Sequence, residues 1–286
     1  MAVRDHLRTL WYATWLGWQV EANWTSTWVF IIYSLAKPVA ATLTLVVMYL
    51  IVLGEVASDP AFFSFMYIGN TFYMFVGQAL FGLTWVLHED REHFQTLKNI
   101  YMAPISFYLY VVGRAVSKII IVSVAVVITM AFGVLVLGLP LELTIVDWPM
   151  FAGAMGIGLV CVAMLGVALA GISMLTARHG AGLNEAMAGM FYLFSGVIFP
   201  LTVLPDAGRW VGMAIPFTYW LEVMRRSLVP QLEIEQISGL AAYSGMEIML
   251  LLLVSGAFFF LVSWGIFRYA DHRARKKGKL DMITTY

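Results

Sequence analysis

The most charged passage between residues 40 and 265 is the stretch 88–106, HEDREHFQTLKNIYMAPIS, whose imidazoles and carboxylates could bind a metal ion. His88 and His93 are five residues apart, so they would not share a helical face, and we predict no metal site. The sequence contains no HExxH or GxSxG motif, which disfavours an enzyme of those classes. It also lacks a GxxxxGK[ST] loop, so we expect no nucleotide to be held by this chain in that way.

The same passage has the pattern of an amphipathic helix. Phe94, Leu97 and Tyr101 recur at offsets of three and four and would lie on one side, with charged side chains around the rest. Such a helix, placed between two long apolar runs, either lies on the bilayer surface or docks into another protein. Both alternatives remain open at this point.

Composition places the chain among membrane proteins that cross the bilayer several times. Of its 286 residues 61% are hydrophobic and 12% are charged, whereas a soluble domain carries about 25% charged residues. The single cysteine, Cys161, excludes an intramolecular disulfide, and we expect it to be a small core residue.

Six apolar runs are long enough to span a bilayer, which takes roughly 20 residues. The predicted spans are Trp28–Leu53, Phe62–Leu87, Ala115–Leu137, Pro149–Leu175, Glu185–Leu204 and Glu247–Phe267. An even number of spans returns the C-terminus to the side on which the N-terminus lies.

The basic residues divide unequally between the two sides of this topology. Of the 17 Lys and Arg residues, only Arg209, Arg225 and Arg226 fall on the side opposite the N-terminus. The positive-inside rule therefore predicts that both termini are cytoplasmic. The stretch 88–106 then faces the cytoplasm, and the basic run from Arg268 to Lys279 is interpreted as a flank attracted to anionic lipid.

Residues 1–27 are interpreted as an interfacial segment that precedes a single transmembrane domain, residues 28–286. Trp11, Trp15 and Trp18 recur at four and three, so they share one helical face, and indole rings prefer the headgroup level. We interpret them as an interfacial anchor, and the alternative is an aromatic surface on which a substrate stacks.

The span interiors contain almost no ionisable residues. An ion-gradient carrier usually needs a titratable or ion-binding group at depth, so we expect the energy for any transport to come from outside the bilayer. A secondary carrier stays as the alternative, followed by a membrane-bound enzyme or scaffold.

The segment after the fifth predicted span is apolar but broken by prolines at 200, 205, 216 and 230. Its pieces are too short to span, which predicts short re-entrant helices in the outer leaflet. Glu222 and Arg226, four residues apart, could form an ion pair on one of them, worth a few tenths of a kcal/mol if exposed. The fourth predicted span carries small residues in pairs (Ala154 with Gly158, Gly166 with Ala170), which favour close helix packing within the chain or, alternatively, a dimer seam.

The chain resembles the ABC-2 type permease family, the membrane halves of ABC exporters for drugs, lipids and lipid-linked polysaccharides. The resemblance covers nearly the whole chain, including the Trp-bearing N-terminus and Lys37-Pro38 at the first span. It is most specific in Glu89–Ser106 with Tyr108–Arg114, and in Ser195–Pro205 with Pro216–Arg226.

The resemblance implies that Glu89–Tyr101 is a coupling helix seated in a groove of a separate ATP-binding subunit. The residues expected to couple to that subunit are Glu89, Asp90, Arg91, Glu92, Phe94, Thr96, Leu97, Tyr101 and Pro104. The expected outer gate and re-entrant helices comprise Ser195, Gly196, Pro200, Pro216, Tyr219, Glu222, Arg225 and Arg226.

The predicted fold class is therefore an all-α polytopic membrane protein with six transmembrane helices, an N-terminal interfacial helix, a cytoplasmic coupling helix and extracellular re-entrant helices between spans five and six. The resemblance implies a permease subunit that is not itself an enzyme and that works in the plasma (inner) membrane of a prokaryote. Its expected partners are two copies of the ATPase subunit, which bind ATP and Mg, a second permease, identical or homologous, and membrane lipid, but no nucleic acid. We expect no cofactor in this chain and a hydrophobic or amphipathic cargo.

Overall fold

Helices account for most of the chain that the structure describes. The computed structural model describes residues 3–23, 26, 28–29, 32, 36, 39–44, 46–48, 59–88, 90, 94–175 and 180–276. The α-helices are α1 (Val3–Ala22), α3 (Pro60–His88), α4 (Leu97–Met102), α5 (Phe107–Leu135), α6 (Trp148–Leu175), α7 (Gly180–Phe194), α8 (Asp206–Ala214), α9 (Pro216–Leu228), α10 (Glu235–Ser238) and α11 (Gly245–Lys276). Two 3₁₀ turns, η3 (Leu201–Val203) and η4 (Pro230–Leu232), flank α8 and α9. No strand occurs within these described ranges, and the all-α prediction is confirmed.

Three of the described helices are long and apolar enough to cross a membrane. They are α5, α6 up to Ser173, and α11, with mean hydropathies of 2.5, 2.4 and 2.3. At 1.5 Å per residue, the 29 residues of α5 extend about 43 Å, more than the roughly 30 Å of a hydrocarbon core. The chain is therefore a multi-pass membrane protein.

The predicted spans agree with the helices to different degrees. Two of the runs agree closely with α3 and α6, and two lie within or over most of α5 and α11, which begin earlier or extend further than predicted. The fifth, Glu185–Leu204, is too long, because α7 ends at Phe194 and Gly196 follows with φ 66. That left-handed conformation suits glycine and stops a helix. The first run, Trp28–Leu53, with Lys37-Pro38, lies largely outside the described residues, so the total of six spans stays a prediction.

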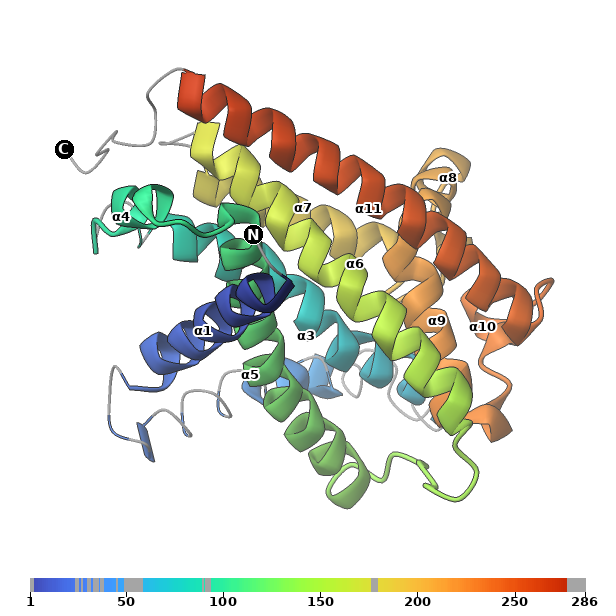
Figure 1. Ribbon diagram of the computed structural model, residues 1–286. Helices are drawn as coiled ribbons and strands as arrows, with labels where there is room; N and C mark the ends of the chain where they lie inside the picture. The colour runs from blue at the N-terminus through green and yellow to red at the C-terminus, as the bar shows by residue number, and fades with distance from the viewer. Residues whose placement is uncertain are drawn as a thin grey trace.

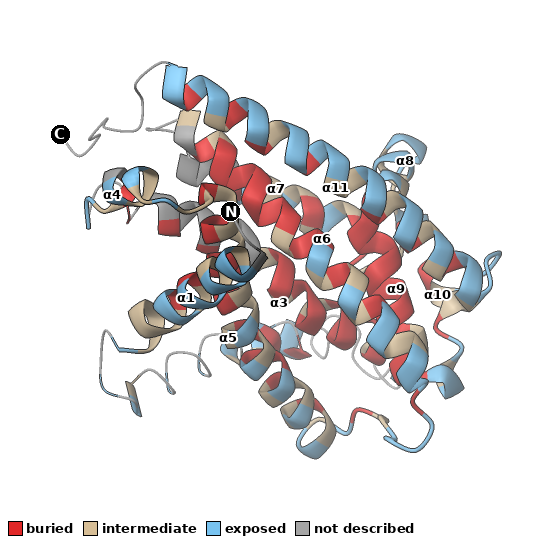
Figure 2. Cartoon of the chain, in the orientation of Figure 1, coloured by how far each residue is buried: buried red, intermediate tan, exposed pale blue. Residues whose placement is uncertain are grey.

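Helix α6 lies at the centre of the bundle, in contact with α3, α5, α9 and α11 (Figure 1). Figure 2 shows mostly buried residues, in red, in the C-terminal half of α6 and along most of α9. Of the predicted small-residue pairs, Ala154 and Ala170 are fully buried, and Gly158 lies under the Trp220 indole. Close packing within the chain accounts for these residues. Cys161 is buried in the same core, as predicted.

Replacing Gly158 by valine is expected to destabilise the contact between α6 and α9. A Cβ at this position would lie 2.1 Å from Trp220 Nε1, and overpacking of this kind costs about 1–3 kcal/mol. Gly156→Val is the matched control, because Gly156 is exposed and a Cβ there would meet nothing within 4 Å. We expect a lower melting temperature in detergent for Gly158→Val alone; equal melting temperatures would contradict the packing argument.

Helix α1 crosses α5 at a close approach (Figure 1). A Cβ on Gly113 of α5 would lie 2.6 Å from the Ala13 Cβ of α1, so small residues bring the two backbones together. Glu21 of α1 also forms an ion pair with Lys118 of α5. The opposite face of α1 exposes Trp11 (67%) and Trp15 (54%).

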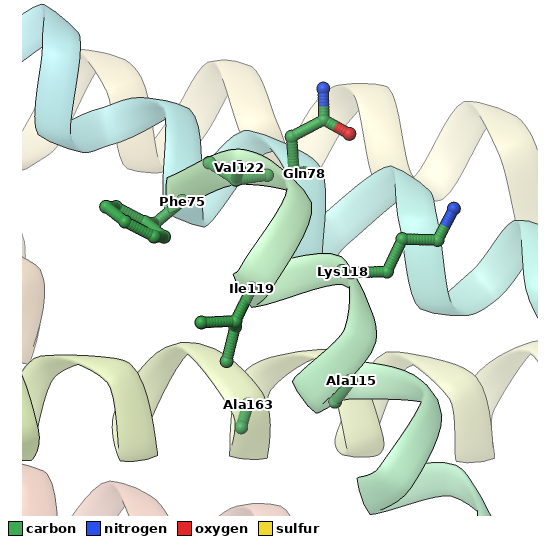
Figure 3. Close-up of a pocket in the computed structure, with 7 residues that line it drawn as sticks. All are labelled: Phe75, Gln78, Ala115, Lys118, Ile119, Val122 and Ala163. Carbon is green, nitrogen blue, oxygen red and sulfur yellow. The ribbon is translucent and has the colours of Figure 1, made fainter. Parts of the chain in front are cut away.

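Helices α3, α5 and α6 are closely packed where they meet. The space between them is about 10 Å³, lined by Phe75, Gln78, Ala115, Lys118, Ile119, Val122 and Ala163. Figure 3 shows the polar ends of Gln78 and Lys118 on one side of this space and Phe75 and Ile119 on the other. A volume of this size is barely that of one water molecule.

Candidate functional site

In the connection between α3 and α5, the described residues 94–106 contain a non-helical stretch at Phe94–Thr96 and the short helix α4. The Thr96 N–H donates to the Asp90 carbonyl oxygen at 2.8 Å, and Gln95 between them has φ 51. The Thr96 N–H therefore does not bond the carbonyl four residues before it, as it would in an α-helix, and helix α4 begins only at Leu97. The predicted continuous helix from Glu89 to Tyr101 is therefore wrong at Phe94–Thr96. Glu89, Arg91 and Glu92 lie outside the described residues.

Asp90 anchors the first half of this connection to α5. Its side chain is 3% exposed, and its Oδ2 accepts a hydrogen bond from the Tyr110 hydroxyl at 2.6 Å. Burial raises the pKa of Asp90, while the positive charge of Arg114 and the bond from Tyr110 lower it. Arg114 is itself 1% exposed, and within the described ranges its Nε and Nη2 have no hydrogen-bond partner.

Helix α4 is held against the bundle by Leu97 and Tyr101. Leu97 is 3% exposed and packs in a cluster with Phe107 and Tyr110 of α5. The Tyr101 ring stacks on Phe107 with 4.3 Å between centroids, and Pro104 follows before α5 begins. These apolar side chains face inward.

The other side of the connection is exposed. Phe94 is 45% and Met102 68% exposed, and Gln95 and Asn99 are exposed as well. Figure 1 shows α4 projecting at the end of the bundle at which α11 also ends. A groove of about 490 Å³ beside it, between α1, α4 and α5, contains Leu16, Ile100 and Tyr110 in its lining.

The second predicted site lies around α9. The chain leaves α7 through Ser195 and Gly196, turns at Pro200 into η3, and enters α9 with Pro216 at its first turn. Thr218 and Tyr219 of α9 donate hydrogen bonds to the carbonyl oxygens of Gly212 and Met213, each at 2.6 Å. These bonds tie α8 to α9.

Arg225 joins three parts of the bundle. Its Nε donates to the Phe65 carbonyl of α3 at 2.9 Å, and its Nη2 donates to the carbonyls of Gly196 (2.8 Å) and Val197 (2.9 Å). The guanidinium also lies 3.6 Å above the Phe65 ring. The guanidinium is planar and carries several N–H donors, so this one cation can bond several carbonyl oxygens at once.

Glu222 forms a buried ion pair, not an exposed one. Its Oε1 accepts from Arg226 Nε at 2.7 Å and from Ser238 Oγ at 2.8 Å, and the Glu222 side chain is 1% exposed. Glu222 Oε2 and Ser195 Oγ line a space of about 10 Å³, and neither has a hydrogen-bond partner in the described part of the chain. The estimate of a few tenths of a kcal/mol for an exposed pair therefore does not apply, because breaking a buried pair costs far more.

Comparison with protein families identifies the fold. The model of the ABC-2 type transporter family matches residues 14–229. The chain belongs to the ABC-2 type transporter family. Among curated proteins, no match was found. The chain is thus the membrane component of an ABC transporter, a transport protein that is not itself catalytic.

In this ABC-2 transporter chain the two predicted sites lie toward opposite ends of the bundle, where Figure 1 shows α4 and α9. Asp90, Thr96, Leu97, Tyr101 and Pro104 gather between α3 and α5. The residues brought together around α9 are Ser195, Gly196, Pro216, Glu222, Arg225 and Arg226, with Pro200 and Tyr219 holding the neighbouring turn and α8.

Sequence reasoning missed several residues of both sites in this ABC-2 transporter chain. Tyr110 was part of a family-like passage, but its bond to Asp90 was not foreseen. Met102 was not among the predicted residues, and the only sequence feature that could have indicated it is its apolar side chain beside a charged run. Ser238 gave none, because its partner Glu222 is 16 residues away. Asp271 has Arg275 four residues along the same helix, but its bond from Tyr101 spans 170 residues and has no local signal.

Proposed function

We propose that this chain is the permease of an ATP-driven exporter, paired with a second permease, identical or homologous, and with two ATP-binding subunits. The observation that carries the proposal is the two-sided α3–α5 connection of an ABC-2 family member. Asp90, Leu97 and Tyr101 hold it inward, and Phe94 and Met102 are exposed outward. A segment anchored on one side and open on the other can receive a push and pass it to the bundle.

In this proposal the ATP-binding subunit holds ATP and Mg and contacts the outward side of the connection. Glu89, Arg91 and Glu92 are expected from the sequence to take part in that contact. Asp90, Thr96, Leu97 and Tyr101 couple by fixing the segment to the bundle, and Pro104 ends it. ATP binding closes the ATPase pair, and the connection moves with it.

The segment from Ser195 to Arg226 is proposed as the outer gate. Helices α8 and α9 contain nine and thirteen residues, too short to span a bilayer, and α9 is buried on nearly all sides. Helices of this length and burial suit a re-entrant cap over the translocation path. In this proposal the first and fifth predicted spans bring the number of transmembrane helices to six. Both termini then lie in the cytoplasm, and the membrane is the inner membrane of a prokaryote.

The surfaces that face lipid suit the same arrangement. The exposed Trp11 and Trp15 of α1, with the half-buried Trp18, fit an interfacial helix along the inner leaflet. A hydrophobic or amphipathic cargo agrees with spans that carry few charges, and it would leave the cytoplasm or the inner leaflet.

Met102→Glu tests the proposal. A charge in the middle of an apolar contact should weaken binding of the co-purified ATP-binding subunit about tenfold or more. Val203→Glu is the matched control, since Val203 is 69% exposed on η3, at the other predicted side of the membrane. Affinity is measured by titrating the purified subunits in lipid nanodiscs.

Two results would contradict the proposal. One is an ATPase complex that Met102→Glu leaves unchanged. The other is transport by the lone chain in liposomes under a proton or sodium gradient without ATP, which would instead support a secondary carrier.

A further inference from the structure

The C-terminal end of α11 is bonded to α4. The Tyr101 hydroxyl donates to Asp271 Oδ1 at 2.8 Å, and Arg275 Nε donates to both oxygens of Asp271 at 3.1 Å. The Arg275 guanidinium lies 4.8 Å from the centre of the Tyr101 ring. Tyr101, Asp271 and Arg275 thus form a closed set of mutual contacts, which we name the α4–α11 latch.

Aromatic stacking supports the latch from α5. Phe107 lies between the Tyr101 ring of α4, at 4.3 Å, and the Phe267 ring of α11, at 6.2 Å. Burial raises the pKa of Tyr101, and the charge of Asp271 raises it further. The hydroxyl therefore stays protonated at physiological pH and remains a donor.

Helix α11 extends from the latch to the outer gate. Its 32 residues contain no proline and extend about 48 Å at 1.5 Å per residue. Beyond the latch it packs along α6 and contacts α9, where Phe259 meets Phe217 at 5.8 Å (Figure 1). The family match ends at residue 229, so α11 lies beyond it.

We propose that the α4–α11 latch passes the movement of α4 along α11 to α9, and that Tyr101, Asp271 and Arg275 are positioning residues for ATP-driven gating. This inference rests on the proposed function. A helix that is bonded at one end to α4 and packed at the other against α9 must shift at both ends when it moves as one body. Two arginines at this end of α11 then differ in role. Arg275 acts through Tyr101. Arg273 contacts only Tyr269 of the same helix among the described aromatic rings.

The test measures outer-gate movement in the complex with the co-purified ATP-binding subunit, in lipid nanodiscs. Spin labels are placed at Leu135→Cys and Trp210→Cys, which are 82% and 74% exposed at the end of α5 and on α8, in a Cys161→Ser background. The distance between labels is compared without nucleotide and after trapping with ATP and vanadate.

Tyr101→Phe keeps the stacked ring and loses only the hydrogen bond, and Arg275→Ala removes the cation above that ring. Arg273→Ala is the matched control, because it removes one positive charge from the same helix end.

The expected result is a nucleotide-dependent distance change in the otherwise unmodified chain and in Arg273→Ala, and its loss in Tyr101→Phe and Arg275→Ala. Combining the two latch variants should add no further loss, because they break one unit. A change retained in Tyr101→Phe would overturn the inference, and so would its equal loss in Arg273→Ala. Absence of any change in the otherwise unmodified complex would overturn the proposed function together with the inference.

Discussion

Replacing Arg225 by methionine is expected to lower the free energy of unfolding by about 3–5 kcal/mol, the usual cost of removing one partner from a buried ionic network. The variant leaves the carbonyls of Phe65, Gly196 and Val197 without their donor, and it leaves Glu222 with one cation fewer nearby. The free energy of unfolding of Arg225→Lys should lie between that of the unmodified chain and that of Arg225→Met, since one ammonium cannot reproduce the planar arrangement of donors. Unfolding by denaturant in mixed micelles measures the difference.

Arg209→Met serves as the control for Arg225→Met. Arg209 is a half-buried arginine of α8 whose Nη2 makes one long contact of 3.5 Å with the Thr202 carbonyl. We expect a change of about 1 kcal/mol or less for it. Equal losses for the two variants would show that Arg225 does not hold α3, α9 and the turn after α7 together.

Replacing Asp90 by alanine is expected to loosen the α3–α5 connection. It removes the acceptor of the Tyr110 hydroxyl and leaves the buried Arg114 without the nearby carboxylate. Hydrogen bonds to charged groups contribute roughly 1.5–3 kcal/mol, which corresponds to about a ten- to hundredfold loss of hydrogen-exchange protection at the amides of α4. Hydrogen exchange followed by mass spectrometry of the peptide containing Leu97–Met102 measures it.

Two tyrosine variants make the Asp90 result specific. Tyr110→Phe removes only the hydroxyl and should reproduce part of the loss. Tyr108→Phe is the matched control, because the Tyr108 hydroxyl contacts only the Met164 sulfur, at 3.4 Å, among the described hydrogen bonds. Unchanged protection of α4 in Asp90→Ala would mean that stacking of Tyr101 on Phe107 suffices to hold the connection.

The α3–α5 connection shows why a local pattern can mislead. The spacing of Phe94, Leu97 and Tyr101 fits a helix, and their neighbours are acceptable helix formers. In the folded chain, however, the Asp90 carboxylate accepts a hydrogen bond from the Tyr110 hydroxyl, and the Asp90 carbonyl accepts one from the Thr96 N–H. The tertiary contacts outweigh helix propensity, which amounts to a few tenths of a kcal/mol per residue. Leu97 and Tyr101 share one side as the pattern predicted, but that side packs against α5 of the same chain, and Phe94 is exposed.

The α9 cluster shows a different limit. Proline spacing predicted where the helices break, and α9 does begin at Pro216. The spacing of Glu222 and Arg226 predicted that they could pair. Burial could not be predicted, because the same i, i+4 spacing serves an exposed pair and an enclosed one.

The sequence by itself determined the class of this protein and its long apolar helices, and it singled out two candidate segments, because apolar length, proline positions and the distribution of charge act locally along the chain. Only the tertiary structure decided which side of each segment is held and which is open. Tyr101 meets Asp271 across 170 residues, and Arg225 meets Phe65 across 160. Contacts between such distant residues depend on how α4, α9 and α11 pack around α6, and no local pattern encodes that packing.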